Sequence, residues 1–375
     1  MKKTVSAVAG VALLGLLLSG CSGTAAPEQS SEKPAASDLA SQMLEEVEPL
    51  MERPTDIGIE EPVSEVPEGK EIVYMQCTPP TCEALGNALD EAAAEVGWTV
   101  RRIPTGATPE DIKKAWAQAV QLEPDAVIGV THDRTYFEDE IQQLAEKDIP
   151  IVRLNLTDEA GDGVTANILD RDYYENAGKI MAQYAMSEHG EDLNALAVTV
   201  GATIPSLQVM AESFTATVEE ACDACTVTTL ELPSTSIGKD LPQRVAAELR
   251  SKPDINFIES GLSDMVLGVP PALRSAGIEP DAVELIALGA LNPAANQSLQ
   301  EGDYLTAILT SASGESMWRA VDLLIREFNG EDISATADAE TYPKWLVTAD
   351  TLPSPEGFPT VEDYQDQFRA LWGLD

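Results

Sequence analysis

The sequence has few basic residues. In 375 residues, 23 lysines and arginines stand against 64 aspartates and glutamates, and the formal net charge is −41 at pH 7. No basic run is available to neutralise phosphate groups, so we expect neither nucleic acid nor anionic lipid headgroups as partners. We interpret the excess of acids as a solvated, acidic surface.

Histidine is nearly missing, with His132 and His189 as the two examples. A serine hydrolase needs a nucleophile, a base and an orienting acid in contact, and no G-x-S-x-G motif is present. No H-E-x-x-H or acidic calcium-loop pattern appears, and no G-x-G-x-x-G follows a first strand. We therefore expect no enzyme activity, no metal and no cofactor. His189 falls near the end of a predicted helix, where a cation is favourable, so we expect a structural role for it.

The N-terminus has the features of an export signal. A basic start at residues 1–3 is followed by an uncharged apolar run that is too short to span a bilayer. Leu18-Ser19-Gly20-Cys21 then resembles the bacterial lipobox, which implies that residues 1–20 are removed and that Cys21 is lipidated. The alternative is an ordinary signal peptide cut nearby, with Cys21 incidental. Both readings predict export, and the first predicts a protein on the extracytoplasmic face of the cell membrane, held by lipid alone.

The remaining cysteines form two close pairs, Cys77 with Cys82 and Cys222 with Cys225. An oxidising compartment favours a local disulfide in each pair. A four-cysteine zinc site and thioredoxin-type redox chemistry are the alternatives. The two pairs are far apart in the sequence, which argues against a shared zinc site. The C-x-x-C motif follows a predicted helix, whereas thioredoxin-type chemistry needs the first cysteine at the start of a helix. We predict structural disulfides.

Residues 21–69 are rich in glutamate, proline, alanine and serine, which predicts an acidic tether. Apolar residues from Leu39 to Met51 recur at helical spacing, so a short amphipathic helix could pack on the body. About 300 residues follow the tether, and a chain of that length usually forms two lobes.

Strand and helix patterns alternate from residue 71 onward, which predicts an α/β fold with parallel, doubly wound sheets. The pattern occurs twice, so we expect two Rossmann-like lobes. The last third alternates irregularly, which predicts a hinge of several strands that suits closure around a ligand. We assign residues 70–166 and 311–345 to the N-terminal lobe, and residues 167–310 and 346–375 to the C-terminal lobe. The predicted strands are residues 72–75, 98–103, 126–130, 149–154, 196–200, 227–230, 255–258, 284–288, 304–309 and 344–348.

Several short motifs, taken together with their order along the chain, resemble the type 1 periplasmic binding proteins, in particular the ribose-like substrate-binding lipoproteins of ABC importers. They are Pro124–Ile128, Asp148–Val152, Leu267-Gly268, Ala272–Gly277, Cys222–Cys225 and the ending Tyr364–Gly373. The resemblance implies the type 1 periplasmic binding protein fold and a monomer. It also implies that the protein captures a small molecule and delivers it to the permease of an ABC transporter. A lipoprotein that presents its ligand to a membrane receptor is the alternative.

Ligands of parallel sheets bind beyond the carboxyl ends of the strands, and the space between two such lobes is the expected site. For each candidate the alternative is a solvated loop residue. Pro79, Thr203, Ser260 and Leu291 lie beside the main candidates. The main candidates are Gln76, Thr78, Thr131, His132, Asp133, Asn155, Gln208, Asp264, Asn292 and Thr310.

The candidate site departs from the sugar-binding pattern of the family. Asn155-Leu156 stands where the sugar binders have an Asp-Arg pair, and Gln208 stands where they have an arginine. Ala290 replaces a second aspartate, and Thr310 replaces a glutamine. Charged groups bind sugar hydroxyls through charge-assisted hydrogen bonds, so their loss predicts a less charged pocket. We expect a sugar or sugar-like ligand, and a ligand with more apolar surface, such as an aromatic, glycosylated or ring-rich compound, is a serious candidate.

Overall fold

The computed structural model describes residues 37–374 except 79, 107, 203, 291, 311 and 312. The predicted signal peptide and Cys21 lie outside the described residues. Within the described part of the chain, no helix combines the length and the apolar character needed to cross a membrane.

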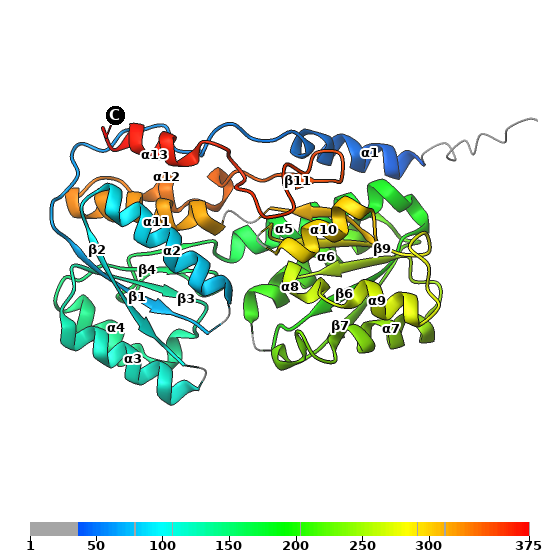
Figure 1. Cartoon of the computed structure of the whole chain (residues 1–375), viewed down its shortest axis with the longest axis horizontal. Helices are drawn as coiled ribbons and strands as arrows, with labels where there is room; N and C mark the ends of the chain where they lie inside the picture. The colour runs from blue at the N-terminus through cyan, green and yellow to red at the C-terminus, as the bar shows by residue number, and fades with distance from the viewer. Residues whose placement is uncertain are drawn as a thin grey trace, which may run out of the picture. The chain divides into compact units, whose positions relative to one another are not determined.

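The first lobe is built on a five-stranded parallel sheet in the order β2-β1-β3-β4-β5 (Figure 1). Side chains alternate along β1: Val73 and Met75 pack with α3 and α4, whereas Ile72 and Tyr74 pack with α2. Helices therefore cover both faces of the sheet. The elements are β1 Glu71–Gln76, α2 Pro80–Glu95, β2 Thr99–Pro104, α3 Pro109–Leu122, β3 Ala126–Val130, α4 Glu138–Ala145, β4 Ile151–Leu154 and β5 Ala166–Ile168.

The second lobe has a six-stranded sheet in the order β11-β10-β9-β8-β6-β7. Its strands are parallel except β11, which pairs antiparallel with β10 at the edge. The elements are α5 Arg171–His189, β6 Asn194–Thr199, α6 Pro205–Ala221, β7 Thr226–Glu231, α7 Leu241–Ser251, β8 Phe257–Ser260, α8 Ser263–Val266, α9 Val269–Ser275, β9 Glu284–Leu288, α10 Pro293–Glu301, β10 Leu305–Leu309 and β11 Leu346–Val347. The expected pair of doubly wound parallel-sheet lobes is confirmed.

Sequence pattern and structure differ in a few elements. Residues 263–275 form two short helices in place of one, because Gly268 takes a left-handed conformation (φ 79°) between α8 and α9. β5 has only three residues and offers no periodicity to read.

The chain passes repeatedly between the lobes after β10. α11 (Ser313–Asn329) packs on α2 of the first lobe, and β11 then returns to the second sheet. α13 (Tyr364–Leu371) packs on α11, where the Trp318 and Trp372 rings stack with centroids 5.4 Å apart. These passages form a hinge of several segments. The residue boundaries assigned to the two lobes stay a prediction.

The N-terminal segment (residues 37–70) is held on the body. Its helix α1 (Asp38–Val47) packs against α5 of the second lobe. Further along, Arg319 of α11 donates a hydrogen bond to the carbonyl of Ile57, and Trp98 donates one to the carbonyl of Pro67. The amphipathic helix expected between Leu39 and Met51 is confirmed as α1, whereas composition assigns the rest of the segment to the tether. The backbone carbonyls that accept these hydrogen bonds leave no trace in composition, so only the structure reveals the contacts.

Candidate functional site

Three neighbouring strands of the first sheet lead into residues with left-handed backbone. Thr131 follows β3 (φ 57°), Asn155 follows β4 (φ 60°) and Leu169 follows β5 (φ 54°). Non-glycine residues adopt this conformation rarely, and a β-branched residue such as Thr131 does so at a cost. Such strain concentrates at functional sites, where surrounding contacts hold it in place. The strained backbone after these strands therefore marks the carboxyl edge of the first sheet as a candidate functional site.

His132 lies at this edge and is largely buried. Its Nε2 is 3.2 Å from Oγ1 of Thr105, which follows β2. Its Nδ1 is buried and has no hydrogen-bond partner among the described residues. Burial, with a smaller contribution from the positive charge of Arg153, lowers the pKa of His132 to about 4. The imidazole is therefore uncharged at neutral pH and can donate or accept one hydrogen bond at the edge.

Arg153 on β4 holds the backbone of His132 in place. The side chain is 1% exposed, donates to the backbone carbonyl of His132 at 2.7 Å and pairs with Asp158. Its guanidinium also lies 5.7 Å from the centre of the Phe137 ring. A buried cation with these partners fixes the loop after β3, because moving the loop would leave the charge without its acceptors.

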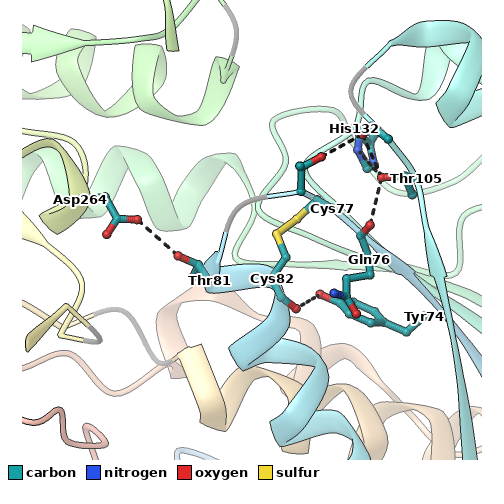
Figure 2. The surroundings of a disulfide bond; sticks show 10 residues. Tyr74, Gln76, Cys77, Thr81, Cys82, Thr105, His132 and Asp264 are labelled. Carbon is teal, nitrogen blue, oxygen red and sulfur yellow. Dashed lines mark hydrogen bonds between the residues drawn. A yellow bond between two sulfur atoms is a disulfide. The ribbon is translucent and has the colours of Figure 1, made fainter. Parts of the chain in front are cut away.

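The loop between β1 and α2 carries a disulfide between Cys77 and Cys82 (Figure 2). The carbonyl of Gln76 accepts hydrogen bonds from the backbone N–H and the hydroxyl of Thr105, at 3.0 and 3.2 Å. The hydroxyl of Thr78 donates to the carbonyl of Gly106 at 3.2 Å. The β1–α2 loop and the residues after β2 are thereby tied together.

Asp264 and Asn292 come together at the carboxyl edge of the second sheet. Asn292 is the N-cap of α10, and its side-chain N–H donates to Asp264 at 2.6 Å. The hydroxyl of Thr81, in the first turn of α2, donates to the other carboxylate oxygen of Asp264 at 3.4 Å (Figure 2). This weak contact joins the two lobes.

One further contact joins the lobes near the hinge. The hydroxyl of Tyr174, in the first turn of α5, donates to the side-chain oxygen of Asn155 at 3.1 Å. Thr310 is 1% exposed, and its hydroxyl accepts the backbone N–H of Trp345 at 3.1 Å. In this conformation the Thr310 hydroxyl therefore supports the pairing of β10 with β11 within the second sheet.

The other predicted residues make local contacts. Asp133 caps the short helix Arg134–Tyr136, with its carboxylate accepting the backbone N–H of Thr135 at 2.9 Å. Gln208 on α6 donates to Glu212 at 2.8 Å. Pro79, Thr203 and Leu291 lie outside the described residues. The ligand-binding role of each candidate stays a prediction.

Sequence reasoning missed Thr81, Thr105, Arg153 and Tyr174. Thr105 directly follows a predicted strand, and Thr81 opens a predicted helix, so the rule that found the other candidates could have found both. Arg153 lies inside a strand and Tyr174 inside a helix. Nothing in the sequence pattern marks those two, because their contacts join segments that only the tertiary structure brings together.

No group of three potential metal ligands occurs among the described residues. Two hollows lie elsewhere on the second lobe: one of about 730 Å³ between α7 and α9, and one of about 280 Å³ between α9 and α10. None of the predicted site residues lines either hollow. The carboxyl edges are the better candidate site, because the strained backbone, His132 and the contacts between the lobes are found there.

The family model of the periplasmic binding protein domain matches residues 73–332. Among solved structures, the glucose-galactose binding protein GanP from Geobacillus stearothermophilus has a TM-score of 0.65 and 18% identity, over 77% of this chain and all of that chain. An allitol-bound ABC transporter solute binding protein from Agrobacterium vitis has a TM-score of 0.63 and 16% identity, over 76% and 97%. No curated protein matches the sequence.

A chain of the XylFII-LytSN complex has a TM-score of 0.63 and 19% identity, over 76% of this chain and all of that chain. At these identities the solved structures establish the fold, and the family model establishes the family. The N-terminal segment lies outside the matched range. The chain belongs to the periplasmic binding protein family and has the type 1 fold of that family.

Proposed function

We propose that the protein is an extracytoplasmic solute-binding lipoprotein that captures a sugar or sugar-like molecule between its two carboxyl edges and delivers it to an ABC importer. The contact between Thr81 and Asp264 carries the proposal, because it joins the two edges directly. A ligand that contacts both edges would stabilise the closed arrangement over the open one by its difference in affinity for the two.

The charges at the edges favour an uncharged ligand. His132 is neutral at neutral pH, and the charge of Arg153 is buried beside Asp158. Asp264 already accepts hydrogen bonds from Asn292 and Thr81. Asp133 accepts the N–H of Thr135 as the cap of a short helix. The other candidate groups are hydroxyls, amides and an imidazole, which bind hydroxyl groups without selecting for charge. Sugars are the ligands named for GanP and other structural neighbours, and a sugar with an apolar substituent fits the reduced charge best.

Lipidation of Cys21 would keep this body at the membrane. With α1 packed on the second lobe, only residues 22–36 would separate the lipid from the body. Fifteen residues span at most about 50 Å when extended, so the body would stay close to the permease. A Cys21→Ser protein should leave the membrane and keep its ligand affinity. Full retention of that variant on the membrane would contradict the anchor.

The proposal is tested by a thermal-shift screen of the mature protein with D-glucose, D-galactose, L-arabinose, D-tagatose, allitol, aryl glycosides and aromatic acids. Binding to the folded state alone raises the melting temperature. We expect shifts for sugars or glycosides, with the aryl glycosides largest. Shifts that are largest for the simple sugars would overturn the inference from reduced charge, and no shift with any compound would overturn the proposed ligand class.

A pair of variants tests whether the compounds found in the screen bind at the carboxyl edges. Asp264→Asn should lower the affinity for the best compound of the screen about tenfold, because it weakens the charge-assisted hydrogen bonds that hold Asn292 and Thr81 in place at the two edges. Asp281→Asn is the matched control, since Asp281 is exposed and lies between α9 and β9, away from the carboxyl edge. Equal affinities in the two variants would argue against binding at this edge.

Presentation of the ligand to a membrane receptor is the second candidate, supported by the XylFII-LytSN complex as a structural neighbour that is bound to another protein. The two candidates differ in what a deletion strain loses. Loss of uptake of the best sugar of the screen supports import. Unchanged uptake together with a lost transcriptional response to that sugar supports sensing.

A further inference from the structure

The protein has two disulfides with short loops in different surroundings. Cys77–Cys82 spans five positions and connects the end of β1 with the first turn of α2, at the carboxyl edge of the first sheet. Cys222–Cys225 spans three positions and connects the end of α6 with the start of β7, at the amino edge of the second sheet. Only the first lies among the candidate ligand residues.

On one side, the Cys77–Cys82 loop leads to His132. The carbonyl of Gln76, next to Cys77, accepts the N–H and hydroxyl of Thr105, and that hydroxyl also contacts the ring of His132 (Figure 2). The position of the imidazole therefore depends on the first residues of this loop.

On the other side, the loop leads to the second lobe. Thr81, next to Cys82, donates to Asp264. The carbonyl of Cys82 accepts the hydroxyl of the buried Tyr74 at 3.0 Å, which holds the first turn of α2 against β1. The same short loop is thus linked to His132 through Thr105 and to the second lobe through Asp264.

We propose that the Cys77–Cys82 disulfide is a positioning element of the ligand site, which holds the β1–α2 loop so that His132 and Thr81 face the ligand in fixed places. This inference rests on the proposed function. A covalent link across the loop removes alternative conformations that a free loop would adopt, and ordering such a loop on binding would cost affinity. Both cysteines are buried, at 7% and 4% exposure, so alanine is the replacement that leaves no unpaired polar group.

Thiol labelling of the unreduced mature protein comes first. We expect none of these four cysteines to react. Labelling of Cys77 and Cys82 in the folded, unreduced protein would overturn the inference at once.

The main experiment compares Cys77→Ala/Cys82→Ala with the matched control Cys222→Ala/Cys225→Ala. Because both loops are short, each variant should lower the melting temperature by only about 5 °C. The first should weaken binding of the best sugar of the screen about tenfold. The control should change that affinity less than about twofold, since its site is distant. Equal affinities in both variants would overturn the inference, because a purely structural disulfide would change stability alone.

Hydrogen exchange separates this inference from the proposed function. In Cys77→Ala/Cys82→Ala, exchange should become faster in residues 76–82 and in the segment around His132, and should stay unchanged in the control. If the wild type binds none of the sugars, the proposed ligand class is wrong, and the exchange pattern still tests the positioning role. Unchanged exchange around His132 would overturn that role.

Discussion

Among the described residues, each sheet buries one arginine or glutamate side chain, and the two are satisfied differently. Arg153 on β4 of the first lobe pairs with Asp158 and donates to the carbonyl of His132. Glu259 on β8 of the second lobe is 0% exposed, and neither of its carboxylate oxygens has a partner among the described residues. The same architecture therefore holds a paired charge in one lobe and an isolated carboxyl in the other.

The comparison shows how partners decide what a buried group does. Arg153 stays charged and organises the loop that carries His132. Burial alone raises the pKa of Glu259 to about 8, so this carboxyl keeps its proton at neutral pH. A buried charge with partners shapes a site, whereas one without partners makes stability depend on pH.

Replacing Arg153 should have the largest effect. Arg153→Met removes the donor to Asp158 and to the His132 carbonyl, and should lower the free energy of unfolding by about 3 kcal/mol. Chemical denaturation measures this loss. Arg101→Met is the control, because it breaks the ion pair with Glu71 at the surface and should cost less than about 1 kcal/mol. Equal losses would mean that Arg153 acts as an ordinary surface cation.

Glu259 should give the wild type a pH-dependent stability. Its pKa is higher in the folded state than in the unfolded chain, so between pH 4.5 and 8 the folded state binds more protons. The contribution is present below the unfolded-state pKa and is lost as the pH rises, by on the order of 3 kcal/mol between pH 4 and pH 7.

Glu259→Gln should therefore match the wild type near pH 4 and exceed its free energy of unfolding near pH 8. Denaturation at both pH values measures this difference. Glu219→Gln, which removes an exposed carboxyl on α6, should leave the pH dependence unchanged. If Glu259→Gln shows the pH dependence of the wild type, Glu259 ionises freely and has access to water.

Replacing Thr131, at the strained carboxyl edge of the first sheet, should have the smallest effect on stability. Thr131→Gly relieves the left-handed conformation of a β-branched residue and should raise the free energy of unfolding by up to about 1 kcal/mol, with the flexibility of glycine offsetting part of the gain. Binding of the best sugar of the screen should weaken at the same time. A destabilised Thr131→Gly protein would show that the threonine side chain makes contacts worth more than the strain.

Periodicity predicted most of the fold. β3 and β9 have the predicted bounds, and the other predicted strands differ from prediction by one or two residues at an end, because a buried strand shows its pattern along its whole length. The carboxyl-edge rule found His132 and Asp264 for a similar reason, since strand ends can be read from the chain. Arg153 lies inside a predicted strand and Glu259 directly follows one, but neither position reveals what the side chain contacts. Their different roles depend on Asp158 and on the absence of an equivalent partner for Glu259 among the described residues.

The sequence by itself determined the two α/β lobes, the candidate loops and the close cysteine pairs, because these depend on patterns within short stretches of chain. Only the tertiary structure decided that residues 52–70 lie on the body, that Thr81 meets Asp264, and that Tyr174 meets Asn155. These features join segments far apart in the chain, and the packing of the sheets alone brings such segments together.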